Sequence, residues 1–332
     1  MNAPLSNDPL IAGVLRSDAG FVARLMRAVE DGAPGARAYL GALRAHTGRA
    51  RVVGITGAPG AGKSTLVDQL VGAWRARGLR VGVLAVDPSS PLHGGALLGD
   101  RIRMMRHAGD PGTLVRSMAS RGQRGGLALR TADLVDILDA AGTDVVVVET
   151  VGVGQDGVDI MELADRTILV QAPGQGDEVQ AMKAGILEIA SILVVNKCDL
   201  DGADRLERDL RAAQALTPGE PGQPPQQILR TQALSGEGVE ALAAAILDSG
   251  IRPSCAQDRQ ERARCRLDYR MAGRARELVL ARLDGWLASD SEAAALRAEL
   301  HAGRIDLEMA AERAVNVLLG ETPPHTAKEQ EL

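Results

Sequence analysis

Residues 51–65 read RVVGITGAPGAGKST, and this stretch decides the fold of the chain. Its first six residues are mostly apolar and partly β-branched, which predicts a buried strand, and the sequence from Ser64 onward (STLVDQLVGAW) has the apolar spacing of an amphipathic helix. Between them, Gly57–Ser64 matches GxxxxGK[ST] in full. The full motif between a strand and a helix indicates a phosphate-binding loop rather than an ordinary glycine turn.

The residue types of this loop suit a nucleoside triphosphate. Glycines let backbone N–H groups curl around a β-phosphate, and the helix N-terminus adds positive potential. Lys63 is placed for the β- and γ-phosphates, and the Ser64 hydroxyl is placed for Mg²⁺. Of the 38 basic residues only four are lysines, so an ammonium at Lys63 is informative. The predicted nucleotide-binding residues of the loop are Gly57, Ala58, Pro59, Gly60, Ala61, Gly62, Lys63, Ser64 and Thr65.

Strand and helix patterns alternate around this loop, which predicts an α/β fold: a P-loop NTPase with a mainly parallel sheet flanked by helices. The candidate strands are Arg51–Thr56, Arg80–Val86, Asp144–Glu149, Arg166–Gln171, Ser191–Asn196 and Gln227–Ala233. Helical patterns without strands precede and follow this region. We therefore expect an N-terminal helical extension over 1–48, a nucleotide-binding domain over 49–250, and a C-terminal helical arm and tail over 251–332.

Composition narrows the class of protein. The chain has 332 residues and is 45% apolar but only 2% aromatic, so we expect an aliphatic core. The net charge of −5 gives no argument for nucleic-acid binding. No apolar run reaches the roughly 18–20 residues of a membrane span, and the N-terminus lacks the pattern of a signal peptide. Three cysteines without a CxxC pair suit a reducing compartment, and we expect a cytoplasmic protein.

Three carboxylates follow strand or loop signals near the expected phosphate edge. Asp87 ends the strand VLAVD, Asp100 begins a helical pattern, and Glu149 ends the strand VVVVE. Together with Ser64 they suit a Mg²⁺ ion held partly through water, with Glu149 as the acid of the Walker B type. Asp100 has a second interpretation as a helix N-cap. Gln155, in VETVGVGQ, either orients the attacking water or is an exposed loop side chain.

The base is predicted to be guanine. NKCD, Asn196–Asp199, follows the strand SILVV. The Asp199 carboxylate can accept hydrogen bonds from N1–H and the exocyclic amine of guanine, whereas adenine has no matching donors. The Lys197 stem can pack on the base plane. After the last strand, the loop Gln232, Ala233 and Leu234 can offer backbone N–H to the guanine O6. We therefore expect GTP, GDP and Mg²⁺ as the bound cofactors.

These motifs together resemble the MeaB/ArgK family, the methylmalonyl-CoA mutase-associated GTPases of the SIMIBI class. The resemblance covers most of the chain and rests on GAPGAGKST, VLAVDPSSP, GGALLGDRIRM, VETVGVGQ, PGQGDEVQAMKAGI and NKCDL. It implies a Mg²⁺-dependent GTPase that forms a homodimer through a C-terminal helical arm. It also implies a chaperone that gates adenosylcobalamin loading and protects an acyl-CoA mutase, either methylmalonyl-CoA mutase or a related isobutyryl- or 2-hydroxyisobutyryl-CoA mutase.

By the same resemblance, Lys63, Ser64, Asp87, Asp100 and Glu149 belong to the phosphate and Mg²⁺ site, and Asn196, Lys197 and Asp199 to the base site. Residues 174–185 match the segment of the family called switch III, which responds to the mutase. The sequence departs from the family pattern at His93, after Gln155 and at Gln232.

Two other functions remain open from the residues. A P-loop kinase of a small molecule or of a transport protein would share the phosphate loop, and NKCD argues against it. A metal-insertion GTPase would favour a His-rich tract or a Cys/His pair, which the sequence lacks.

Overall fold

The computed structural model describes residues 8–87, 105–107, 109–119, 126–150, 163–174, 190–216, 226–248, 259–289 and 291–319. The chain divides into two compact units, Met1–Asp268 and Tyr269–Leu332. Each unit is described by itself.

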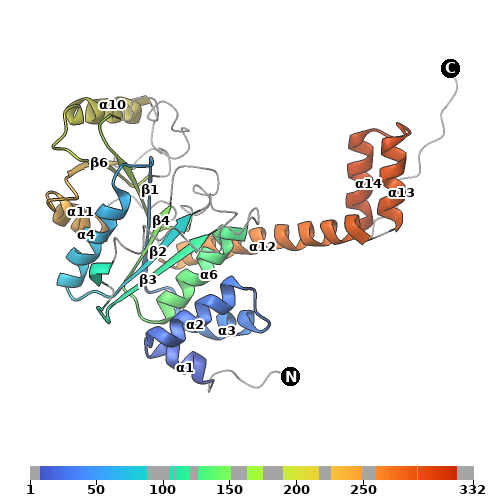
Figure 1. The fold of residues 1–332 in the computed structure, drawn as a ribbon, viewed down its shortest axis with the longest axis horizontal. Helices are drawn as coiled ribbons and strands as arrows, with labels where there is room; N and C mark the ends of the chain where they lie inside the picture. Colours follow the sequence, from blue (N-terminus) through green and yellow to red (C-terminus); the bar gives the residue numbers. More distant parts are fainter. Residues whose placement is uncertain are drawn as a thin grey trace. The chain divides into compact units, whose positions relative to one another are not determined.

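The described residues of the first unit form a seven-stranded sheet in the order β3-β2-β4-β1-β5-β6-β7 (Figure 1). Every neighbouring pair is parallel. The strands are β1 (Arg51–Gly57), β2 (Val81–Asp87), β3 (Thr113–Ala119), β4 (Val145–Thr150), β5 (Arg166–Gln171), β6 (Ile192–Asn196) and β7 (Gln227–Thr231). The predicted class, a parallel sheet flanked by helices, is confirmed, and β1 lies centrally between β4 and β5.

One strand was missing from the sequence prediction. β3 reads TLVRSMA, pairs only with β2 and forms an edge of the sheet. Val115 of this strand is 39% exposed, and the half-buried Arg116 makes an ion pair with Glu30. An edge strand carries polar side chains without harm, so its pattern is weaker than that of the buried central strands.

Helices cover both faces of the sheet (Figure 1). α4 (Lys63–Ala76) and α11 (Val239–Leu247) pack together on one face. α6 (Gly126–Ala140) covers the other face, and the N-terminal helices pack on it. The N-terminal helices are α1 (Pro9–Leu15), α2 (Ala19–Glu30), α3 (Ala36–Leu43) and the short 3₁₀ turn η2 (Arg44–His46). α10 (Ala203–Leu216) packs against β6, and a second 3₁₀ turn, η3 (Met105–His107), precedes β3.

The valines of β4 show why this strand is buried on both faces. Val145 and Val147 belong to the core cluster under α4 and α11, whereas Val146 and Val148 belong to the cluster under α6 and the N-terminal helices. Successive side chains of a strand point to opposite faces, so a run of four valines fills both cores. The carboxyl end of β4 therefore emerges from the middle of the sheet, where open α/β sheets bind ligands.

The second unit is helical. The boundary between the units falls within α12 (Arg259–Ser289), and α13 (Ser291–His301) and α14 (Leu307–Leu319) follow. α13 and α14 contact each other, and Arg313 makes an ion pair with Glu299 at 2.8 Å. Among the described residues, no helix has the length and apolarity to cross a membrane.

Candidate functional site

The loop between β1 and α4 depends on two glycines. Gly57 has φ +146°, and a Cβ atom there would lie 2.0 Å from the carbonyl oxygen of Val170 on β5. Gly62 has φ +91°, and a Cβ atom there would lie 2.4 Å from the Asn196 side-chain nitrogen. Both positions therefore require glycine for backbone conformation and for space. α4 begins directly after Gly62, so its N-terminus faces the loop.

Lys63 is the first residue of α4 and lies inside this loop. Its side chain is 7% exposed, and Nζ donates hydrogen bonds to the carbonyl oxygens of Gly57 at 2.8 Å and Ala58 at 2.9 Å. The loop carbonyls thus hold the ammonium at the start of the helix. A buried cation at a helix N-terminus makes this position attractive for an anion such as a phosphate group.

Ser64 and Glu149 meet although they come from different elements. The Ser64 hydroxyl of α4 donates to Glu149 Oε1 at 2.6 Å, and Glu149, on β4, is 3% exposed. A hydroxyl and a carboxylate in contact are hard oxygen donors, which is the chemistry that Mg²⁺ prefers. The donor set therefore fits a magnesium ion.

The remaining predicted acidic residues are less defined. Asp87 is the last residue of β2, whose Val86 pairs with Thr150, so its backbone lies at the same edge of the sheet as Glu149. The position of the Asp87 side chain is not described. Asp100 and Gln155 lie outside the described residues, as does the segment 174–185 apart from Gly174.

Asn196 connects the base motif to the phosphate loop. It is 2% exposed, and its Nδ2 donates to the Ala61 carbonyl at 2.8 Å. Its Oδ1 accepts hydrogen bonds from the Thr231 hydroxyl at 3.0 Å and from the Ala233 backbone N–H at 3.1 Å. One amide side chain therefore holds three loops together. Sequence reasoning missed Thr231, because no motif distinguishes it from other strand threonines.

Lys197 follows in an unusual conformation. Its φ of +56° is rare for a residue other than glycine, and it turns the chain directly after β6. The Lys197 ammonium donates to the Gly60 carbonyl at 2.9 Å, so the side chain spans from the base motif to the phosphate loop. Asp199, two residues later, is exposed.

Cys198 lies between these residues, in surroundings that favour its neutral thiol. Burial raises the pKa of its thiol, and the negative charges of Glu237 and Asp199 add to this effect. Raising the pKa favours the neutral thiol, which is neither a good nucleophile nor a good metal ligand.

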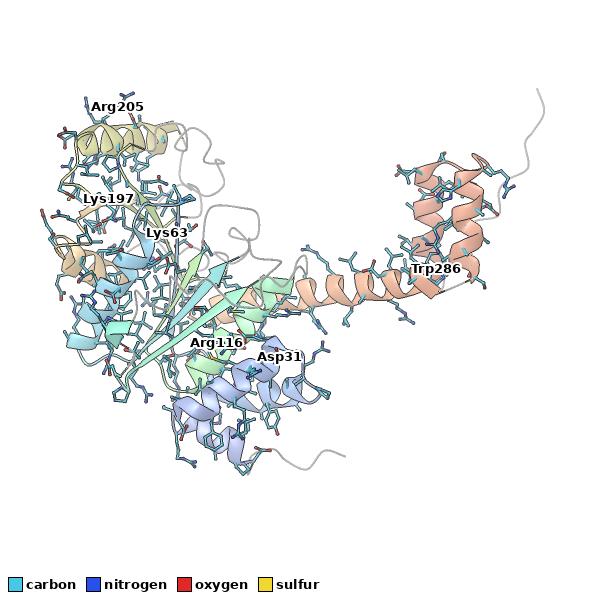
Figure 2. All side chains as sticks on the ribbon, viewed as in Figure 1. Asp31, Lys63, Arg116, Lys197, Arg205 and Trp286 are labelled. Carbon is cyan, nitrogen blue, oxygen red and sulfur yellow. The ribbon has the colours of Figure 1, made fainter. Side chains whose placement is uncertain are left out.

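A cavity of about 730 Å³ is lined by residues of both the phosphate loop and the NKCD motif. Its volume lies in the range of about 300–1,000 Å³ that is typical of small-molecule sites. It is lined by Pro59, Gly60, Gly62, Lys63, Ser64, Thr65, Glu149, Asn196, Lys197, Asp199, Leu200, Gln232, Ala233 and Leu234. Figure 2 labels Lys63 and Lys197, which extend from different elements to this part of the sheet.

Three predicted residues of the phosphate loop do not line the cavity, and one residue that lines it was not predicted. Gly57, Ala58 and Ala61 are not part of the lining; they lie behind it and contact Lys63 or Asn196 through their carbonyl groups. Leu200 lines the cavity but was not predicted, although it directly follows the NKCD motif.

Comparison with known proteins places these observations in a family. The family model described as "Methylmalonyl Co-A mutase-associated GTPase MeaB" matches residues 22–285. A "putative GTPase" of Pyrococcus horikoshii is 51% identical over 239 residues, which are 71% of this chain and 75% of that protein. "GTPase ArgK" of Escherichia coli is 43% identical over 162 residues, which are 49% of each chain.

A mouse relative and a solved structure extend the comparison. The mouse protein, "Methylmalonic aciduria type A homolog, mitochondrial", is 36% identical over 190 residues, which are 56% of this chain and 46% of that protein. The crystal structure of a "LAO/AO transport system kinase" superposes with a TM-score of 0.66, covering 96% of this chain and 99% of the other. At 23% sequence identity, this likeness concerns the fold alone.

Proposed function

This chain belongs to the family of methylmalonyl-CoA mutase-associated GTPases, and on that basis we propose a Mg²⁺-dependent GTPase that acts as a chaperone of an adenosylcobalamin-dependent acyl-CoA mutase. The proposal that the chain binds a nucleotide rests on one observation, the cavity that the phosphate loop and the NKCD motif share. It joins a phosphate loop to an NKCD motif through Asn196, so one ligand with both triphosphate and base reaches both.

In this proposal the guanine base lies against Asp199 and the loop Gln232–Leu234, which line the same cavity as Lys63. Asp199 is exposed, so its carboxylate is available to accept from N1–H and the exocyclic amine of guanine. The Lys197 stem packs on the base plane. The triphosphate follows the loop Gly57–Thr65 to Lys63, whose ammonium neutralises charge on the transferring phosphoryl group.

Ser64 and Glu149 hold Mg²⁺ in this proposal, with Asp87 and Asp100 as further acidic partners of the site. The 2.6 Å contact between the Ser64 hydroxyl and the Glu149 carboxylate supports this assignment. When bound, the ion offsets negative charge that develops on the phosphate oxygens. Gln155 is proposed to orient the attacking water.

The partner assignment rests on the family description and on the mouse relative's name, both of which refer to methylmalonyl metabolism. The test is steady-state hydrolysis of GTP and of ATP, each with and without methylmalonyl-CoA mutase and adenosylcobalamin. We expect GTP hydrolysis that the mutase accelerates, and ATP hydrolysis at least about 100-fold less efficient, because ATP leaves polar groups of the base site unpaired. Equal use of ATP would contradict the guanine assignment. GTP hydrolysis that no acyl-CoA mutase changes would contradict the partner.

A homodimer through the second unit completes the proposal. Large apolar side chains are exposed on its helices, and association would remove them from water. They are Met271, Leu278, Val279, Leu280, Leu307, Met309, Val315 and Leu319.

We expect Leu278→Glu to convert the dimer to a monomer, because a carboxylate would have to be buried without a partner. Light scattering gives the mass. Ala298→Glu is the matched control, since Ala298 is an exposed residue of α13, a helix that carries none of these exposed apolar side chains. A Leu278→Glu protein that stays dimeric, together with a dimeric chain truncated near Ile251, would place the interface elsewhere.

A further inference from the structure

Two buried hydroxyl groups lie directly behind the proposed Mg²⁺ residues. Thr56, on β1, and Thr150, on β4, are both 0% exposed, and their Oγ1 atoms are 3.0 Å apart in a hydrogen bond. Thr56 directly precedes Gly57, the first residue of the phosphate loop, and Thr150 directly follows Glu149. The hydrogen bond therefore joins the residue before the phosphate loop to the residue after Glu149.

The strand register shows on which face this pair lies. Ile55 is the partner of Glu149 in the β1–β4 ladder, so Thr56 and Thr150 are the next opposed pair. Ile55 belongs to the core under α4, and Glu149 contacts Ser64 of α4. Because side chains alternate along a strand, the two threonines point to the opposite face.

That opposite face is otherwise apolar in these strands. Val52 of β1 and Val146 and Val148 of β4 point there and belong to the cluster under α6 and the N-terminal helices. A valine at position 56 or 150 would continue the pattern with the same shape. Both positions instead carry hydroxyl groups, and the hydrogen bond between them offsets part of the free-energy cost of burying polar groups on this apolar face.

We propose that the Thr56–Thr150 hydrogen bond is a positioning element that sets the distance between Glu149 and the phosphate loop, and thereby the affinity of the site for Mg²⁺. The inference rests on the proposed GTPase function. The two threonines do not line the nucleotide cavity, so in this proposal they act through Glu149. Gly57 is confined by the Val170 carbonyl on the β5 side, and Thr150 confines its neighbour Thr56 on the β4 side. The start of the loop is thus held from both sides.

The test replaces the hydroxyls without changing shape. In the Thr56→Val/Thr150→Val double variant, we expect the Mg²⁺ concentration for half-maximal GTP hydrolysis to rise about fivefold, at the low end of the coupling that links two sites in one protein. The rate at saturating Mg²⁺ should stay near that of the wild type. The same shift should appear when Mg²⁺-dependent binding of a non-hydrolysable GTP analogue is titrated, which needs no turnover. Glu149→Gln should show a larger shift in the same direction.

Three comparisons separate positioning from general damage. Thr150→Ser keeps the hydroxyl and should keep the Mg²⁺ dependence of the wild type. Thr143→Val removes another buried hydroxyl, which donates to the Leu138 carbonyl at 2.7 Å near the amino end of β4, and should leave the Mg²⁺ dependence unchanged. Each single valine variant should also shift the Mg²⁺ dependence, because either one removes the Thr56–Thr150 hydrogen bond.

The outcomes are distinguishable. A wild-type protein that binds GTP with Mg²⁺, together with a double variant of unchanged Mg²⁺ dependence, would overturn the positioning role and leave the GTPase function intact. A shift of equal size in Thr143→Val would also overturn it. A wild-type protein that binds no GTP would overturn the proposed function and this inference with it. Melting curves without nucleotide, recorded for the wild type and for every variant, ensure that the Mg²⁺ titrations compare folded proteins.

Discussion

Lys63→Ala is expected to lower the kcat for GTP hydrolysis by about 10²–10³-fold, the range found when one preorganised electrostatic group is removed from an active site. Lys63 is buried, and two loop carbonyls hold its ammonium next to the helix N-terminus. Such a group needs no reorganisation when charge moves onto the transferring phosphoryl group. Single-turnover hydrolysis with GTP bound in advance measures this rate apart from nucleotide affinity.

Two matched variants test the cause of the loss. Lys63→Arg keeps the positive charge but replaces a compact ammonium with a planar guanidinium. It should also be impaired, because Lys63 is buried and a guanidinium group is larger than the ammonium that donates to the carbonyls of Gly57 and Ala58. Lys197→Ala removes the other lysine of the cavity and should weaken nucleotide binding while changing the rate of bound GTP much less. A Lys63→Ala protein whose bound GTP turns over within a few-fold of the wild-type rate would remove Lys63 from the chemistry.

Asp199→Asn is expected to exchange the base preference from guanine to xanthine. In the proposed site, the Asp199 carboxylate accepts two hydrogen bonds from guanine. In the variant, the NH₂ group of asparagine would face the exocyclic amine of guanine, so two donors would meet. Loss of such pairs costs roughly 1–3 kcal/mol each, so GTP affinity should fall by about 10²-fold or more. Xanthosine triphosphate has a 2-oxo group that accepts from the asparagine NH₂, so its affinity should rise by a similar factor. Equilibrium titration with GDP, xanthosine diphosphate and ADP, which carry the guanine, xanthine and adenine bases without a γ-phosphate to hydrolyse, measures the affinity for each base.

The control lies two residues away. Asp201 is exposed like Asp199, but it does not line the cavity. Asp201→Asn changes the net charge by the same amount and should leave all three affinities unchanged. If both variants lost GTP affinity equally, the effect would be one of general charge rather than of base recognition. If Asp199→Asn kept the preference for guanine, the base would be bound by other groups.

The phosphate loop and the base motif were predictable from sequence because their chemistry is local. A turn that must avoid the Val170 carbonyl and the Asn196 amide requires glycine at Gly57 and Gly62, and this requirement is visible in the sequence as spacing. The burial of β4 on both faces was also predictable from its four valines, since such a strand has no alternation of apolar and polar residues. These local patterns determined the class of fold and the class of ligand.

The strand order and the contacts between distant segments were decided by the tertiary structure alone. β3 was not predicted, because an edge strand lacks the continuous apolar sequence of the strands at the centre of the sheet. The hydrogen bonds of Asn196 to Ala61, of Lys197 to Gly60 and of Thr150 to Thr56 join residues far apart in the chain, and no periodicity encodes them. The sequence by itself determined which side chains we expect at a guanine-nucleotide site. Only the packing of parallel strands with their carboxyl ends at one edge brought Lys63, Glu149 and Asp199 to a single cavity, because it is the sheet register that sets their distances.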